Sequence, residues 1–276
     1  MKDTSALLQH YGEHDLLGRL ENALVALAMT ERLTSADLAA LDQFHVRGLA
    51  ATMDLAEAAE IKRDAAVIDI GSGLGGPSRY LAEAFGCRVT GVDLNPAFVE
   101  AASYLGNRSV AHESVHYMCA DALALPFENA SFDYGWTQHV AMNVADRDRL
   151  YGEAFRVLRP GGRLCIYDIL TGSGEPLHFP VPWSKDANTS FVVSPASMIR
   201  SLEGQGFRLS KWTDQTRIAI AWLAEREQSD RRASASRSTL GLQLIMGPDW
   251  PAMAANMRRN LVEGRTRLVQ TVFDRP

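Results

Sequence analysis

The chain contains few cysteines, three among 276 residues, and they lie far apart in the sequence. An odd number of widely spaced cysteines inside apolar stretches argues against a disulfide framework and gives no C-x-x-C spacing for a metal. We therefore expect three reduced thiols and no metal site. The three residues are Cys87, Cys119 and Cys165.

Long apolar runs are also missing. The nearest candidate, Ala23–Met29, is much shorter than the roughly 20 apolar residues that a membrane span needs. Residues 1–4 lack the basic start and the apolar core of a signal peptide. From these two absences we expect a cytoplasmic protein with no membrane partner.

Basic residues are fewer than acidic residues: 28 Lys+Arg and 33 Asp+Glu give a formal net charge of -5. This balance argues against nucleic acid as a partner, so the basic stretch Ser229–Ser238 is interpreted as a solvated helix face or loop. With 46% apolar and 22% charged residues, the composition is that of a globular protein. We expect a small-molecule partner and leave a homodimer open.

From Ala65 onward, short β-rich runs alternate with helical stretches, which is typical of βαβ units around a parallel sheet. The runs that predict strands are Ala66–Ile70, Arg88–Asp93, Val115–Asp121, Phe132–Gln138, Gly162–Ile169, Phe207–Thr216 and Thr266–Phe273. At about 100–200 residues for each domain, the length fits one α/β domain with helical additions.

Helix signals lie before and between these runs. Leucines at helical spacing predict helices within residues 1–60, one of them capped by Thr34 or Ser35. Asn95-Pro96 is a helix start, because Asn caps and Pro fits the first turn. Leu150–Leu158 predicts another helix, which a turn at Arg159–Gly162 ends.

Two segments interrupt this alternation. Residues 171–195, rich in Pro and Gly, predict a long surface loop on the substrate side. Residues 218–263 predict a helical insertion before the last strand.

The segment Asp69–Gly76 is a glycine-rich loop between the first predicted strand and a predicted helix, Ser78–Phe85. Glycine allows positive φ and a close approach of the backbone to a ligand, and a helix start favours negative charge. A tight turn without a ligand would use the same residues. Dinucleotide-binding enzymes also have such a loop, so the loop alone does not identify the ligand.

Three carboxylates lie at the ends of predicted strands, in register with this loop: Asp69, Asp93 and Asp121. The carboxyl ends of the strands are where open α/β sheets bind ligands. There Asp93 could accept ribose hydroxyls, Asp121 an adenine amino group, and Asp69 a charged amino group. The three together favour a nucleoside-containing ligand.

The whole set of motifs resembles the class I S-adenosylmethionine-dependent methyltransferases, over about Asp64 to Leu170. The matching residues are Val67–Gly73, Gly91–Asp93, Ala120–Ala122, Leu125–Phe127, Ser131–Asp133 and Val157–Gly162. The continuation Gly75–Leu81 looks like the branch of the sarcosine/dimethylglycine, phosphoethanolamine and tocopherol methyltransferases. The resemblance implies a Rossmann-like α/β fold with helices on both faces of a seven-stranded, mostly parallel sheet whose last strand is antiparallel.

The resemblance also implies S-adenosylmethionine as cofactor and S-adenosylhomocysteine as product. The residues implied to bind the cofactor are Asp69, Gly71, Ser72, Gly73, Asp93, Leu94, Asp121, Ala122 and Gln138. Residues 61–276 would form the methyltransferase domain and residues 1–60 a helical lid. A nicotinamide dinucleotide is the rival ligand, but the loop has an additional glycine, Gly75, and the later motifs have no role in that interpretation.

On the acceptor side, His139 is the first candidate for a general base, because it follows the fourth strand and has a suitable ordinary pKa. The alternative is a buried histidine that only shapes the pocket. His45 is a second candidate from the lid. Tyr11, Phe179 and Trp183 are candidate substrate contacts, although each could simply pack against the fold.

A lidded pocket predicts a free small molecule as methyl acceptor. The resemblance makes an amine nitrogen the first expectation, with oxygen on an aromatic ring and an activated carbon acid as alternatives. A protein that binds the cofactor without catalysis is a further alternative. A nucleic-acid methyltransferase would also have this domain, but the negative charge and the lid argue against it.

Overall fold

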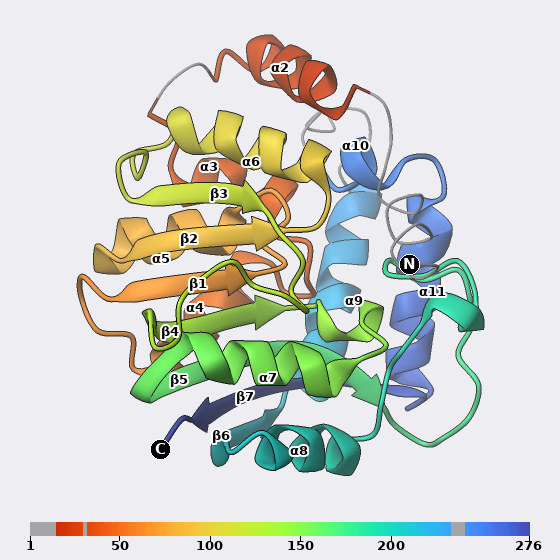
Figure 1. Cartoon of the computed structure of the whole chain (residues 1–276). Helices are drawn as coiled ribbons and strands as arrows, with labels where there is room; N and C mark the ends of the chain where they lie inside the picture. Colours follow the sequence, from red (N-terminus) through yellow and green to blue (C-terminus); the bar gives the residue numbers. More distant parts are fainter. Residues whose placement is uncertain (1–14, 30–31, 233–240) are drawn as a thin grey trace.

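The computed structural model describes residues 15–29, 32–232 and 241–276 (Figure 1). Tyr11 and most of the basic stretch predicted as a solvated face lie outside the described residues. In the described ranges, no helix combines the length and the apolar character that a membrane crossing requires.

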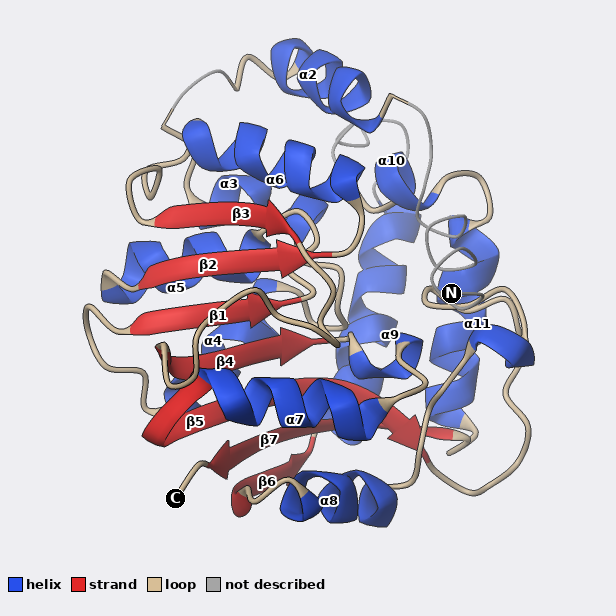
Figure 2. Ribbon diagram, in the orientation of Figure 1, coloured by secondary structure: helices blue, strands red, loops and turns tan. Residues whose placement is uncertain are grey.

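Seven strands form one sheet in the order β3-β2-β1-β4-β5-β7-β6 (Figure 2). All neighbours from β3 to β5 are parallel, whereas β7 runs antiparallel to both β5 and β6. The predicted mostly parallel sheet with an antiparallel last strand is therefore confirmed. The strands are β1 (Ala66–Ile70), β2 (Arg88–Asp93), β3 (Val115–Cys119), β4 (Phe132–Gln138), β5 (Leu158–Thr171), β6 (Arg208–Asp214) and β7 (Thr266–Asp274).

Helices cover both faces of this sheet. They are α2 (Leu16–Ala26), α3 (Ser35–Asp42), α4 (Leu49–Ala59), α5 (Gly76–Phe85), α6 (Pro96–Asn107), η1 (Ala141–Asn143), α7 (Arg147–Val157), η2 (Ala187–Thr189), α8 (Pro195–Gly204), α9 (Thr216–Arg232), α10 (Gln243–Met246) and α11 (Trp250–Val262). On one face, Leu55 of α4, Leu81 of α5 and Met257 of α11 join one core. On the other face, Tyr151 of α7 and Leu202 of α8 join a second core.

The N-terminal helices pack onto the edge of the domain. Leu20 and Leu24 of α2 share a third apolar cluster with Leu105 of α6 and Ile245 of α10. Elements far apart in sequence, α2 and α10, therefore lie side by side next to α6 (Figure 1). Burial of this apolar face holds α2 in place, because a helix of this length has little stability of its own.

Two helix starts follow the local signals in the sequence. The Thr34 side chain accepts a hydrogen bond from the Asp37 N–H, and the Asp37 carboxylate accepts one from the Thr34 N–H, so the predicted cap of α3 is confirmed. The Asn95 side chain caps α6 by accepting from the Ala97 N–H at 3.0 Å, also as predicted.

Several predicted boundaries were wrong. β3 ends at Cys119 rather than at Asp121, because Asp121 Oδ1 accepts the N–H of Leu123 at 2.8 Å and turns the chain. The predicted turn Arg159–Gly162 is a bulge within β5: the Gly161 N–H donates to the Arg275 carbonyl, and the Gly162 carbonyl accepts from the Arg275 N–H. The helix expected from Ser78 begins at Gly76.

The predicted surface loop 171–195 is only partly on the surface. Val181 and Trp183 are buried among apolar side chains from α4, α9 and α11. The prediction failed because prolines and glycines exclude regular structure, but they do not decide whether the aromatic residues between them face solvent.

Candidate functional site

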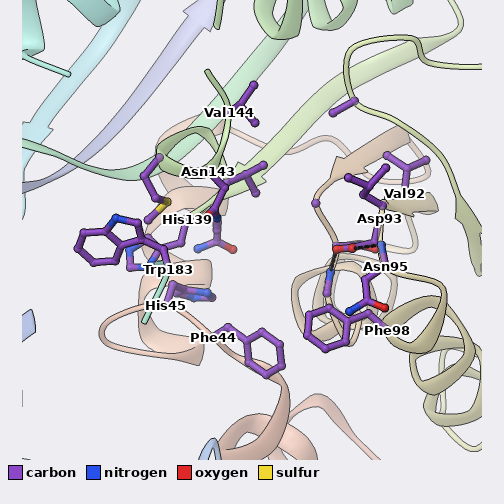
Figure 3. Close-up of a pocket in the computed structure, with 18 of the residues that line it drawn as sticks. Phe44, His45, Val92, Asp93, Asn95, Phe98, His139, Asn143, Val144 and Trp183 are labelled. Carbon is purple, nitrogen blue, oxygen red and sulfur yellow. Dashed lines mark hydrogen bonds between the residues drawn. The ribbon is translucent and has the colours of Figure 1, made fainter. Parts of the chain in front are cut away.

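A cavity of about 280 Å³ opens at the carboxyl ends of β1, β2 and β4, where this type of sheet binds ligands. Asp69, Asp93 and Gln138 come from the ends of these three strands and all line it. Figure 3 shows two walls, with Val92, Asp93, Asn95 and Phe98 on one side and His45, His139, Asn143 and Trp183 on the other.

The glycine loop forms the floor of the cavity. The N–H groups of Gly71 and Ser72 both donate to the carbonyl of Val92, at 2.8 and 3.0 Å. Gly71 has a φ of 74°, and a Cβ there would lie 2.4 Å from Val140 Cγ2. Only glycine fits, because the chain after β4 packs directly on the loop.

Asp69 of β1 is 2% exposed, and its Oδ2 accepts a hydrogen bond from the hydroxyl of Ser78, in the first turn of α5, at 2.6 Å. Burial, more than the nearby Asp93 charge, raises the pKa of Asp69 to about 7. No cation neutralises this carboxylate within hydrogen-bond reach among the described residues. A ligand ammonium group would therefore find an acceptor here that favours positive charge.

Asp93 is held by two backbone donors. Its Oδ2 accepts from the Gly73 N–H and its Oδ1 from the Asn95 N–H, both at 2.9 Å. Burial raises the pKa of Asp93, while these two bonds act in the opposite direction. Each carboxylate oxygen keeps a lone pair for a further donor, such as one of two neighbouring hydroxyl groups.

The remaining predicted cofactor residues also line the cavity, namely Gly73, Leu94, Asp121 and Ala122. The Ser72 hydroxyl is buried, and the part of the chain that the structure describes offers it no partner. The Nε2 of Gln138 is buried in the same way, with no acceptor in the described ranges. Two orphaned donors beside two carboxylates fit a polar ligand with acceptor groups.

The two predicted histidines lie together on the opposite wall, with ring centroids 6.0 Å apart. His45 Nε2 lies 3.0 Å from the Gly48 carbonyl and therefore donates to it, and burial lowers the pKa of His45 to about 4. The ring of His139 stacks on Tyr167 at 5.5 Å, and burial, with a smaller effect of His45, lowers its pKa well below the ordinary value. Both imidazoles are neutral near pH 7.

Of the predicted substrate contacts, Trp183 lines the cavity and donates through Nε1 to Ser190 Oγ at 2.9 Å. Phe179 does not line it. Its side chain is partly buried against the apolar core that includes residues of α4 and α11. Of the two aromatic residues predicted from this loop, one, Trp183, therefore lies at the cavity. Tyr11 is outside the described residues.

The comparisons agree with this geometry. Residues 68–166 match a family described as a methyltransferase domain. A chloroplastic tocopherol O-methyltransferase of Arabidopsis thaliana is 39% identical over 108 residues, which cover 39% of this chain and 31% of that protein. The chain spans between 31% and 48% of the length of the first curated relatives that it matches.

Two solved structures share the fold over most of the chain. Geranyl diphosphate C-methyltransferase from Streptomyces coelicolor A3(2), in complex with S-adenosyl-L-homocysteine, has a TM-score of 0.71 at 17% identity over 99% of this chain and 98% of that one. Phosphoethanolamine N-methyltransferase 2 of Haemonchus contortus, in complex with S-adenosyl-L-methionine, has a TM-score of 0.68 at 20% identity over 96% of this chain and 61% of that one. Residues 68–166 therefore belong to a methyltransferase domain, and the sheet around them has the topology of the class I methyltransferase fold.

A buried ion pair joins the N-terminal segment to the glycine loop. Arg79 and Asp42 are 1% and 0% exposed, and Arg79 donates to Asp42 Oδ2 and to the Leu74 carbonyl, both at 2.6 Å. Burial raises the pKa of Asp42 to about 6, although Arg79 counters it. Because Asp42 lines the cavity, α3 is part of the site.

Several residues that line the cavity were not predicted from the sequence. They are Phe44, Phe98, Met142, Asn143, Leu242, Met246 and Trp250. Phe44 and Phe98 meet edge-to-face at 5.8 Å, which joins the segment after α3 to α6. Apart from the position of Asn143 shortly after β4, none has a local signal, because tertiary packing brings these segments together.

Hydrogen bonds connect the loop that carries Trp183 to α11. Asn260 is 0% exposed; its Oδ1 accepts the His178 N–H at 2.9 Å and its Nδ2 donates to the His178 carbonyl at 3.0 Å. Asn256 Nδ2 donates to the Pro180 carbonyl at 3.0 Å. The position of the cavity wall around Trp183 therefore depends on the helical insertion.

Proposed function

We propose that this chain transfers a methyl group from S-adenosylmethionine to a small-molecule acceptor and releases S-adenosylhomocysteine. The observation that carries the proposal is the arrangement of Asp69, Asp93 and Gln138 around one cavity at the strand ends. Together they offer an acceptor for an ammonium group, a fixed carboxylate for hydroxyl groups and an unpartnered amide donor for a carboxylate. When bound, the cofactor supplies a methyl group on a cationic sulfur.

The protein contributes alignment and exclusion of water to such a displacement. Phe44, Met142 and Trp183 give the side of the cavity near the histidines an apolar lining. His45 and His139 are neutral there, so either can accept a hydrogen bond from the acceptor without placing a charge beside the cationic sulfur.

For the acceptor atom we propose the nitrogen of a small amine. Trp183, Trp250 and Phe44 offer aromatic faces that tolerate the positive charge that an amine develops on methylation. A neutral imidazole of low pKa is a hydrogen-bond acceptor for an amine that enters uncharged. A hydroxyl oxygen is the second candidate. The histidines and aromatic residues on this side of the cavity carry no negative charge, so they do not require an acceptor that becomes positively charged.

The test is a panel of small amines, phenols and carbon acids incubated with the protein and S-adenosylmethionine. S-adenosylhomocysteine release and the mass of the methylated product are measured. We expect turnover with amines, or with phenols if the second candidate holds. Binding of the cofactor without turnover on any of the three classes would support the alternative of a non-catalytic binding protein.

A further inference from the structure

The loop after β4 carries a buried polar atom that the cofactor residues leave unused. Asn143 ends η1 and lines the cavity on the wall of His139 and Trp183 (Figure 3). Its Oδ1 is buried, and no donor within the described ranges reaches it. A carbonyl oxygen that is removed from water without a donor is costly, so such an atom needs a partner.

Protein groups nearby do not supply that partner. The indole N–H of Trp183 already donates to Ser190 Oγ at 2.9 Å. The indole N–H of Trp136 donates to Gln138 at 2.8 Å. His45 Nε2 is committed to the Gly48 carbonyl at 3.0 Å.

The peptide group between Met142 and Asn143 is held by hydrogen bonds at both its N–H and its carbonyl, which restrains the backbone that carries the Asn143 side chain. The Asn143 N–H donates to the Val140 carbonyl at 2.9 Å, and the Met142 carbonyl accepts the Phe191 N–H at 2.8 Å. Val140 is itself held against Gly71, where an added Cβ would lie only 2.4 Å from its Cγ2. Asn143 is therefore anchored both to the cofactor loop and to the loop that carries Trp183.

We propose that Asn143 recognises the methyl acceptor. Its Oδ1 accepts a hydrogen bond from an N–H or O–H group of a substrate that is otherwise apolar and uncharged. This inference rests on the proposed function and narrows it. Met142 and Val144 flank Asn143 in the cavity wall, so the rest of the substrate contacts apolar surface. Acceptors without an N–H or O–H group, such as a hydrocarbon double bond, leave Asn143 unpartnered and are disfavoured.

The test compares pairs of ligands in which methylation removes this donor, and Asn143→Leu controls for the added methyl groups. The dissociation constants of phenol and anisole, and of aniline and N,N-dimethylaniline, are measured with S-adenosylhomocysteine bound. We expect the wild-type protein to prefer the donor-bearing member of each pair about five-fold, the ratio that one neutral hydrogen bond gives. Asn143→Leu should reduce this ratio to about one, whereas Asn143→Asp, which keeps the acceptor oxygen, should retain it for phenol.

Asn188→Leu is the matched control, because Asn188 is an exposed asparagine that does not line the cavity. It should leave all ratios unchanged. S-adenosylhomocysteine affinity is measured for every variant, and an unchanged value shows that Asn143→Leu is folded. Equal ratios in the wild type and in Asn143→Leu, or no measurable binding of either pair, would overturn the inference alone. Failure of the wild type to bind S-adenosylhomocysteine would refute the proposed function and the inference with it.

Discussion

Trp136 Nε1 donates a hydrogen bond to Gln138 Oε1 at 2.8 Å, between two buried side chains on the same face of β4. An indole N–H can only donate, so this bond decides which way the amide of Gln138 is turned. The amide oxygen faces Trp136, and the Nε2 donor is left for a ligand in the cavity.

Replacement of Gln138 should therefore weaken cofactor binding. Gln138→Met keeps the side-chain volume but removes the donor, and we expect S-adenosylmethionine to bind about ten-fold more weakly, as for a hydrogen bond to a charged group. Isothermal titration calorimetry measures the change. Gln205→Met, which alters a glutamine outside the cavity, should have no effect. An unchanged dissociation constant in Gln138→Met would show that its Nε2 does not meet the cofactor.

Asp69 should make cofactor affinity depend on pH. Its pKa of about 7 means that below pH 7 most of the unliganded protein carries a protonated Asp69. A cationic ligand favours the carboxylate and must displace this proton, so affinity rises about ten-fold for each pH unit from 5 to 7 and then levels off. The dissociation constant of S-adenosylmethionine, measured at several pH values, tests the slope.

Asp42 has a pKa of about 6 and titrates in the same window, so a variant must separate the two carboxylates. Asp69→Asn should weaken binding and remove most of the pH dependence. The histidines do not contribute, because the pKa of His45 is about 4 and that of His139 is also well below its ordinary value. If the affinity of Asp69→Asn for S-adenosylmethionine still rises with pH in the same way, Asp69 is not the group whose titration controls cofactor binding.

The Arg79–Asp42 ion pair should contribute far more to stability than an exposed pair of equal length. Arg79→Met leaves a buried carboxylate without its partner, and we expect a loss of about 3–5 kcal/mol in the free energy of unfolding. Arg159–Asp133 is the matched control, since it has the same 2.6 Å distance with side chains 46% and 36% exposed. Arg159→Met should cost less than about 1 kcal/mol.

Urea denaturation measures both losses. The double variant Asp42→Leu/Arg79→Met should recover part of the stability, because no unpaired charge remains in the core. Similar losses for Arg79→Met and Arg159→Met would mean that burial does not distinguish the two pairs.

Replacement of Asn260 should weaken the binding of the methyl acceptor and leave the binding of the cofactor unchanged. Asn260→Leu breaks both hydrogen bonds to the His178 backbone and loosens the loop that carries Trp183. We expect the KM for the acceptor to rise several-fold while the dissociation constant of S-adenosylmethionine stays the same. Asn256→Leu, which removes one bond to Pro180, should have a smaller effect. A change confined to cofactor affinity would contradict this role.

The sequence was sufficient to predict that the proposed cofactor residues gather at one cavity, because their signals are local. Asp69 and Asp93 each end a strand of β-rich residues, and Gly71 has a backbone conformation that favours glycine. Their positions along the chain already place them at one edge of a parallel sheet. The antiparallel last strand was expected from the family resemblance, not from the residues alone.

The opposite wall of the cavity, around Trp183, was not predictable in the same way. Phe179 and Trp183 lie in one irregular loop with similar local sequence, and tertiary packing alone sends Trp183 to the cavity and Phe179 to the core. Trp250 and Met246 reach the cavity because α10 packs near α2, a contact across most of the chain. No periodicity or motif encodes such a contact.

The central claim, that this cavity binds S-adenosylmethionine, is tested most directly by thermal unfolding with S-adenosylmethionine, S-adenosylhomocysteine, NAD or NADP. At about 100 times its dissociation constant a ligand stabilises the fold by roughly 2.7 kcal/mol, which raises the midpoint by several degrees. The account predicts a rise with both sulfur compounds and none with the dinucleotides. A rise with NAD or NADP alone would contradict it and assign the glycine loop to a dinucleotide.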